Sequence, residues 1–116
     1  MAETLGCSTS MVSMSKPLPD FGVLRQMVSR TQVVVALTGE LDGATRQVAF
    51  DACVASESRD IVVDLGAVSF MDCSGYGALM AARAELRRRG GSLTLRNARG
   101  EPARLLLLIR EGEAAC

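Results

Sequence analysis

The chain has 116 residues, of which 48% are hydrophobic, and this suits one compact domain with its own core. Thirteen basic residues balance thirteen acidic ones, so net charge gives no reason to expect binding to nucleic acid or to an anionic membrane. Histidine is absent, which removes Ser-His and Cys-His nucleophile pairs, His-ligated zinc and the commonest general base. We therefore do not expect ordinary hydrolase chemistry.

The cysteines form no recognisable site. They are Cys7, Cys53, Cys73 and Cys116, with neither a C-x-x-C pair nor a repeated spacing typical of zinc sites or disulfide frameworks. No apolar run approaches the roughly 18 residues that span a bilayer, and the N-terminus lacks the basic and hydrophobic regions of a secretory signal. These features predict reduced thiols in a cytoplasmic protein, without a metal or cofactor and without direct insertion into a membrane.

The first part of the chain predicts a leader and a hairpin. Residues 1–20 are rich in Ser, Thr and Met and show no periodicity, so we expect a flexible leader and assign the domain to residues 21–116. Residues 23–28 and 32–38 favour β-structure and are separated by three polar residues, which predicts a β-hairpin. The Gly-containing stretch 39–43 is expected to break the second strand.

A first helix and a central strand are expected next. Residues 44–55 carry apolar side chains at helical spacing, which would bury one face of the helix. These side chains are Ala44, Val48, Ala52 and Ala55. Residues 60–65 form a short apolar run typical of a strand covered on both faces, so we expect a central strand there.

A second helix is expected after the stretch Asp72–Gly75. Its buried face would be formed by Leu79, Ala82 and Leu86. The helix should end at Gly90-Gly91, because glycine favours the C-cap and the arginines at 87–89 suit the negative end of the helix dipole. This interpretation of the arginine run is favoured over an RNA site.

Residues 92–96 alternate in polarity and predict another strand. Pro102, at an early helical position, opens an apolar segment that runs to Ile109 and is interpreted as a last helix, with a strand as the alternative. The order β-β-α-β-α-β-α predicts the α/β class: a mixed sheet with parallel later strands and helices packed against it.

Three local motifs follow one another in this frame. They are Leu-Thr-Gly-Glu-Leu-Asp at 37–42, Val-Val-Asp-Leu at 62–65 with Val-Ser-Phe-Met-Asp at 68–72, and Gly-Tyr-Gly-Ala-Leu at 75–79. Together they resemble the second-strand end, the central strand with its switch loop, and the second-helix start of the STAS family, specifically of bacterial anti-sigma factor antagonists. The resemblance covers roughly residues 23–110.

The resemblance implies a non-enzymatic regulator of transcription. Such a domain captures an anti-sigma factor, usually a serine kinase of the histidine-kinase-like ATPase type, and thereby frees a sigma factor. Phosphorylation of a switch-loop Ser or Thr by that kinase breaks the complex, because the phosphate adds nearly two charges to a surface that must fit flush against the partner. The partner-binding residues implied here are Glu40, Asp42, Asp72, Gly75 and Tyr76.

The switch loop departs from the family pattern. The usual phosphoacceptor position is occupied by Cys73. Ser74 could accept phosphate instead, or it could serve as the N-cap of the second helix. A thiol at a helix N-terminus tends toward a lowered pKa, so Cys73 is either a redox-sensitive element of the docking surface or a small residue in place of Ser. A C-x5-R phosphatase loop is excluded, because position 79 is Leu79 rather than Arg.

Three aspartates are expected to have structural roles. Asp42, Asp64 and Asp72 fall at strand ends and turns, where Asp commonly bonds to the backbone, and Asp72 is expected to shape the switch loop rather than to catalyse.

Relatives usually continue into a further strand and helix after the last helix, whereas this sequence ends at Cys116. We therefore expect that the sheet lacks an edge strand. An uncovered stripe over residues 105–109 would favour a partner or self-association.

The resemblance also allows a second function. Single STAS domains also occur as accessory subunits of membrane transporters for lipids or anions. Such a subunit can dock on a cytoplasmic ATPase and needs no membrane span of its own.

Overall fold

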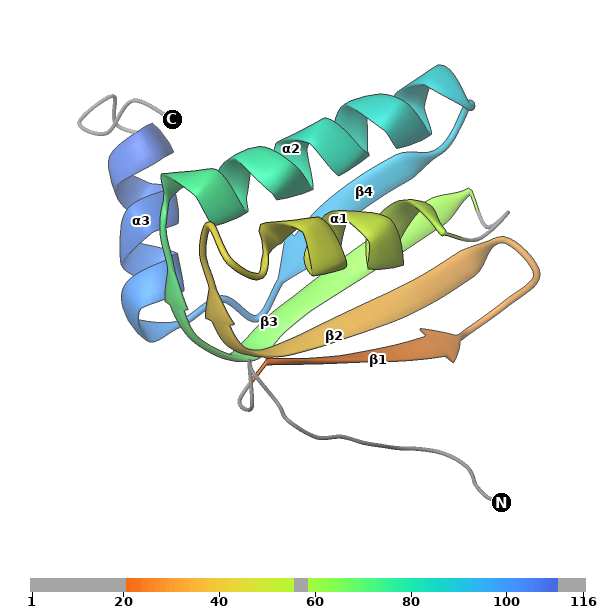
Figure 1. The fold of residues 1–116 in the computed structure, drawn as a ribbon. Coiled ribbons are helices and arrows are strands. Elements are labelled where there is room, and N and C mark those ends of the chain that lie inside the picture. Colours follow the sequence, from red (N-terminus) through yellow and green to blue (C-terminus); the bar gives the residue numbers. More distant parts are fainter. Residues whose placement is uncertain (1–20, 56–58, 111–116) are drawn as a thin grey trace, which may run out of the picture.

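The computed structural model describes residues 21–55 and 59–110. Its elements are β1 (Gly22–Met27), β2 (Gln32–Leu41), α1 (Arg46–Val54), β3 (Asp60–Met71), α2 (Cys73–Arg88), β4 (Ser92–Arg96) and α3 (Gly100–Arg110) (Figure 1). This order confirms the predicted one, and the α/β class with it. The predicted leader lies outside the described residues.

The four strands form one mixed sheet in the order β1-β2-β3-β4. Strand β1 is antiparallel to β2, and the predicted hairpin is closed by the Val28 N–H, which donates to the Gln32 carbonyl at 2.9 Å. Strands β2, β3 and β4 are parallel, as expected for strands joined through helices. Helices α1 and α2 lie on one face of this sheet (Figure 1).

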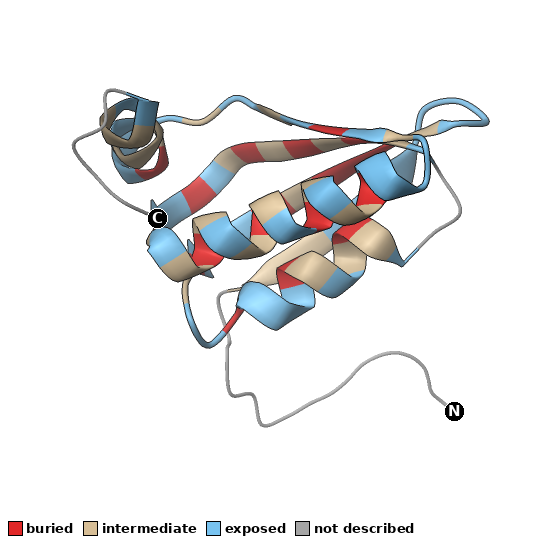
Figure 2. Ribbon diagram, turned by 90° about the horizontal axis from the view of Figure 1, so that it is seen from above, coloured by how far each residue is buried: buried red, intermediate tan, exposed pale blue. Residues whose placement is uncertain are grey.

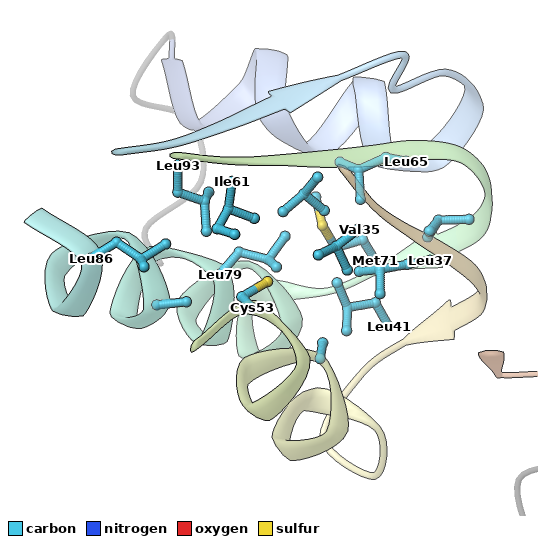
Figure 3. Close-up of a cluster of buried hydrophobic side chains, with 14 of the residues drawn as sticks. Val35, Leu37, Leu41, Cys53, Ile61, Leu65, Met71, Leu79, Leu86 and Leu93 are labelled. Atoms are coloured by element: carbon cyan, nitrogen blue, oxygen red, sulfur yellow. The ribbon is translucent and has the colours of Figure 1, made fainter. Parts of the chain in front are cut away.

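The core lies between that face and the two helices. Its strand residues include Val33, Val35 and Leu37 of β2, Ile61, Val63 and Leu65 of β3, and Leu93 of β4. Figure 2 shows that the buried positions of both helices face the sheet. Figure 3 shows Cys53 of α1 and Leu79 and Leu86 of α2 directed at this layer. The predicted buried face of α2 is therefore confirmed.

Strand β3 lies inside the sheet, as predicted, and its two faces are covered unequally. Its burial alternates, with Ile61, Val63 and Leu65 buried while Val62 and Asp64 are half-buried. Helices α1 and α2 cover one face of the sheet, and α3 also packs against β3, so the cover expected on both faces is complete on one face and only partial at Val62 and Asp64. In the described part of the chain, no helix has the length and hydropathy needed to cross a bilayer.

The buried face of α1 was also predicted wrongly. The buried residues are Ala49 and Cys53, whereas Val48 is 47% exposed. The helix begins at Arg46 because the Asp42 carboxylate accepts hydrogen bonds from the backbone of the preceding turn, so Ala44 belongs to that turn. Burial raises the pKa of the Cys53 thiol to about 12, so this cysteine is an inert core residue.

Strand β2 is longer than predicted. Gly39 does not end it, because Gly39 adopts a φ of 94° and the chain passes through two register shifts before continuing to Leu41. Such bulges bend a strand without breaking it. The last residues of β2 and β3, Leu41 and Met71, consequently lie side by side.

Helix α3 packs against β3, which excludes the alternative strand. Pro102 is its third residue and is buried, as its early position predicted. The apolar run at 105–109 is only partly covered, and Leu107 is 49% exposed.

Candidate functional site

The parallel ends of β2 and β3 bring two sequence-predicted segments together. The Asp72 N–H donates to the Leu41 carbonyl oxygen at 3.2 Å. Gly75 lies directly on the same carbonyl, since a Cβ at Gly75 would be 2.4 Å from the Leu41 oxygen. Only glycine permits this approach. The start of α2 is thereby fixed against the end of β2.

Asp72 caps α2. Its Oδ1 accepts hydrogen bonds from the Gly75 N–H at 2.9 Å and from the Ser74 hydroxyl at 2.6 Å. Desolvation raises the pKa of Asp72, but these bonds outweigh it and hold the pKa below its ordinary value. The N-cap role considered for Ser74 was therefore wrong, because Asp72 occupies that position.

Asp42 organises the turn between β2 and α1. Its Oδ1 accepts from the backbone N–H of Ala44 at 2.9 Å and of Thr45 at 3.2 Å. The buried Thr45 hydroxyl donates to the Glu40 carbonyl at 2.7 Å and lies 3.0 Å from the Asp42 N–H. Asp42 is thus a backbone-bonding residue, as its position in the sequence indicated.

The third acid, Asp64, lies away from this turn. Its carboxylate accepts from the Gly66 N–H at 2.8 Å, the Asn97 amide at 3.1 Å and the Arg96 guanidinium at 3.3 Å. The Gly66 bond is the main reason why the pKa of Asp64 lies below its ordinary value. Asp64 therefore connects β3 to the chain that leads into α3.

A groove of about 470 Å³ lies between α1 and α2 at the same end of the molecule. Arg46, Gln47 and Phe50 of α1 line one wall, and Cys73, Ser74, Gly77, Ala78 and Ala81 of α2 line the other. Four of the α2 residues are small and recur three or four residues apart, so they form one face of the helix. Their size leaves the groove open: a Cβ at Gly77 would meet no atom within 4 Å.

The structure brings some of the predicted site residues together and places the others elsewhere. Asp42, Asp72, Ser74 and Gly75 lie together, but Tyr76 is on the other flank of α2, half-buried against the core cluster. Glu40 is exposed near the end of β2, opposite Phe70 in the strand register.

Cys73 is exposed and disulfide-bonded, which contradicts its expected state as a reduced thiol.

The α1 wall of the groove was missed by sequence reasoning. Arg46, Gln47 and Phe50 belong to a helix whose buried face had been placed one residue away. A sequence signal existed only for the α2 wall, namely the spacing of Ser74, Gly77, Ala78 and Ala81, which places small residues along one side of that helix.

Comparisons with known proteins agree with this fold. A family described as "Mlab, STAS domain" matches residues 25–112. The anti-sigma factor antagonist SpoIIAA in its unphosphorylated form is 27% identical, with 75% of this chain and 83% of that chain covered and a TM-score of 0.56. The phosphorylated form of SpoIIAA, a Bacillus cell fate determinant, is 28% identical over 79% of this chain and 85% of that chain, with a TM-score of 0.55.

An anti-sigma factor antagonist from Mycobacterium paratuberculosis is 26% identical, with 85% of this chain and 83% of that chain covered and a TM-score of 0.61. The family match spans most of the chain and includes all of the site residues described above. The protein therefore belongs to the STAS domain family.

Proposed function

We propose that this protein is an anti-sigma factor antagonist, a non-enzymatic regulator that binds an anti-sigma factor of the serine-kinase type and so releases a sigma factor. The observation that carries the proposal is the contact of Gly75 with the Leu41 carbonyl. It joins the Asp42 turn and the Asp72–Gly75 loop into one surface beside the groove. Support comes from two similar antagonists, which share the fold at 27% and 26% identity.

The surface suits protein docking better than catalysis. One wall of the groove consists mainly of small side chains and the other includes the apolar Phe50, so a protruding side chain of a partner could enter it. The carboxylates of Asp42 and Asp72 are both engaged by backbone N–H groups, which leaves them poorly placed to transfer protons. We therefore assign these two acids to shaping the surface.

We assign the switch to Ser74. Its hydroxyl is half-buried at the edge of the groove, so a phosphate there would add negative charge where the partner must fit. Incubation with the captured kinase and ATP should add one phosphate to the wild-type protein and none to Ser74→Ala, as measured by intact mass. Equal phosphorylation of both proteins would remove Ser74 from the switch.

Cys73 offers a redox control of the same surface. It is exposed, adjoins Ser74 and is disulfide-bonded in the structure. A dithiol reductant would supply two electrons and two protons and convert that disulfide into two thiols. Partner binding should then differ between oxidised and reduced wild-type protein but not between oxidised and reduced Cys73→Ser. An identical response of the two proteins would exclude this control.

The decisive experiment is affinity capture with a groove-filling variant. Gly77→Gln should fill the groove without a backbone clash, because the space around Gly77 is open. Ala84→Gln is the matched control, since Ala84 is exposed on the same helix outside the groove. Recovery of an ATPase-type serine kinase with the wild type and Ala84→Gln, but not with Gly77→Gln, would support the proposal. Equal recovery with all three would contradict it.

An accessory subunit of a lipid or anion transporter is the second candidate. This function is considered because the family that matches residues 25–112 is described by the name Mlab and not as an antagonist family. Recovery of transporter subunits in the same capture would favour this function over the first.

A further inference from the structure

The groove between α1 and α2 contains one hydroxyl and one cation on opposite walls. Ser74 lies on the α2 wall and Arg46 on the α1 wall. Among the described residues that line the groove, Arg46 is the single charged one. Its side chain is exposed, so it can move without disturbing the core.

A phosphate on Ser74 could not keep the present hydrogen bond. The Ser74 hydroxyl now donates its proton to Asp72 Oδ1 across 2.6 Å. A phosphorylated serine has no such proton, and two anions at that distance would repel each other. Asp72 remains in place because it also accepts from the Gly75 N–H at the start of α2. The phosphate must therefore turn away from Asp72.

The direction it can take is set by the neighbouring turn. A Cβ on Gly43 would be in ordinary van der Waals contact with Ser74 Oγ, at 3.7 Å, so this turn borders the hydroxyl, and the open space beside Ser74 is the groove that it lines. Both helices begin at this end of the molecule, and neither has an acidic residue in its first turn (Figure 1). The positive ends of the two helix dipoles therefore partly offset the negative charges of Asp42 and Asp72.

From this geometry we propose that a phosphate on Ser74 turns into the groove and pairs with the guanidinium of Arg46. The inference rests on the proposed function, which supplies the kinase. In the transfer, Ser74 Oγ forms a bond to the γ-phosphorus of ATP, the bond from that phosphorus to the bridging oxygen breaks, ADP leaves, and the hydroxyl proton passes to a base of the kinase. The pair then spans the groove and closes it to a partner.

The pairing can be measured without any partner. Phosphoserine is incorporated at position 74 of the full chain by genetic code expansion, and its phosphate is titrated by ³¹P NMR. The second pKa of a free phosphoserine is about 6. Pairing with Arg46 should lower it by roughly 0.5 unit or more relative to Arg46→Gln. The difference should shrink in about 1 M salt, which screens the pair.

Arg83→Gln is the matched control, because Arg83 lies on α2 and does not line the groove. It should leave the phosphoserine pKa at the wild-type value. Equal pKa values in the wild type, Arg46→Gln and Arg83→Gln would overturn the pairing and leave the proposed function standing. A lowered pKa combined with capture of no serine kinase would support the pairing geometry and reject the proposed function.

Discussion

Helices α2 and α3 differ in burial although both carry leucines and other apolar residues. In α2, Leu79, Ala82 and Leu86 are at most 1% exposed, whereas Leu107 of α3 is 49% exposed. The apolar residues of α2 recur every three or four positions and share one face, while the consecutive residues at 105–109 point all around α3. Spacing, more than hydrophobic content, decides which helix is anchored in the core.

The largest effect is expected at the centre of the anchored face. Leu79→Ala should lower the free energy of unfolding by about 2–5 kcal/mol, because it leaves a cavity in a close-packed core. Leu107→Ala, the matched change in α3, should lower it by about 1 kcal/mol or less. Urea unfolding of both variants measures the difference. Equal losses would show that α3 is as firmly packed as α2.

The next effect concerns the contact that positions the start of α2. Gly75→Ala should destabilise the protein by about 1–3 kcal/mol, because the new Cβ would collide with the Leu41 carbonyl. Gly77→Ala should leave stability unchanged or raise it by up to about 1 kcal/mol, since alanine is the better helix former and has room there. Thermal unfolding should rank the two variants on opposite sides of the wild type. The same rank for both would contradict the close contact.

A smaller effect is expected from the cap. Asp72→Ala should lower the free energy of unfolding by about 0.5–2 kcal/mol. Because the pKa of Asp72 is depressed in the folded protein, its contribution is complete above the ordinary value of 3.8 and is lost as the pH falls through the lower, folded-state pKa. Wild type and Asp72→Ala should therefore converge in stability as the pH is lowered below about 4. A constant gap down to pH 2 would contradict this assignment.

The smallest effect is expected at the other end of α2. Glu85 pairs with Arg88 and, at 3.0 Å, with Arg89, and these pairs keep the pKa of Glu85 below its ordinary value. Because the pairs are exposed, solvent and salt screen them. Glu85→Gln should leave the melting temperature unchanged within error at physiological salt. A clear drop at both low and high salt would show that this end of the helix is anchored too.

Much of the fold follows from local pattern. The alternating residues at 92–96 and the three-to-four spacing from Leu79 to Leu86 define β4 and α2 without reference to anything distant. The end of β2 is different, because a glycine at position 39 predicts a break equally well when it forms a bulge. Only pairing with β3 distinguishes the two, and pairing is not visible in one segment.

The candidate site was predictable on one side only. The motifs identified the Asp42 turn and the Asp72–Gly75 loop, and their side chains bond to nearby backbone as local sequence suggests. The α1 wall with Arg46 and Phe50 was not predictable, because it depends on where α1 begins and how it lies beside α2. The turn held by Asp42 sets that starting point through hydrogen bonds that spacing alone does not reveal.

The connection from β3 to α2 requires a fixed number of residues. Asp72 is bonded to the Leu41 carbonyl, and three residues later Gly75 lies on the same group, so an inserted or deleted residue between them would have to give up one contact. The exposed side chain of Cys73 takes part in neither of these two contacts. The loop can therefore change its chemistry one side chain at a time while keeping a constant number of residues.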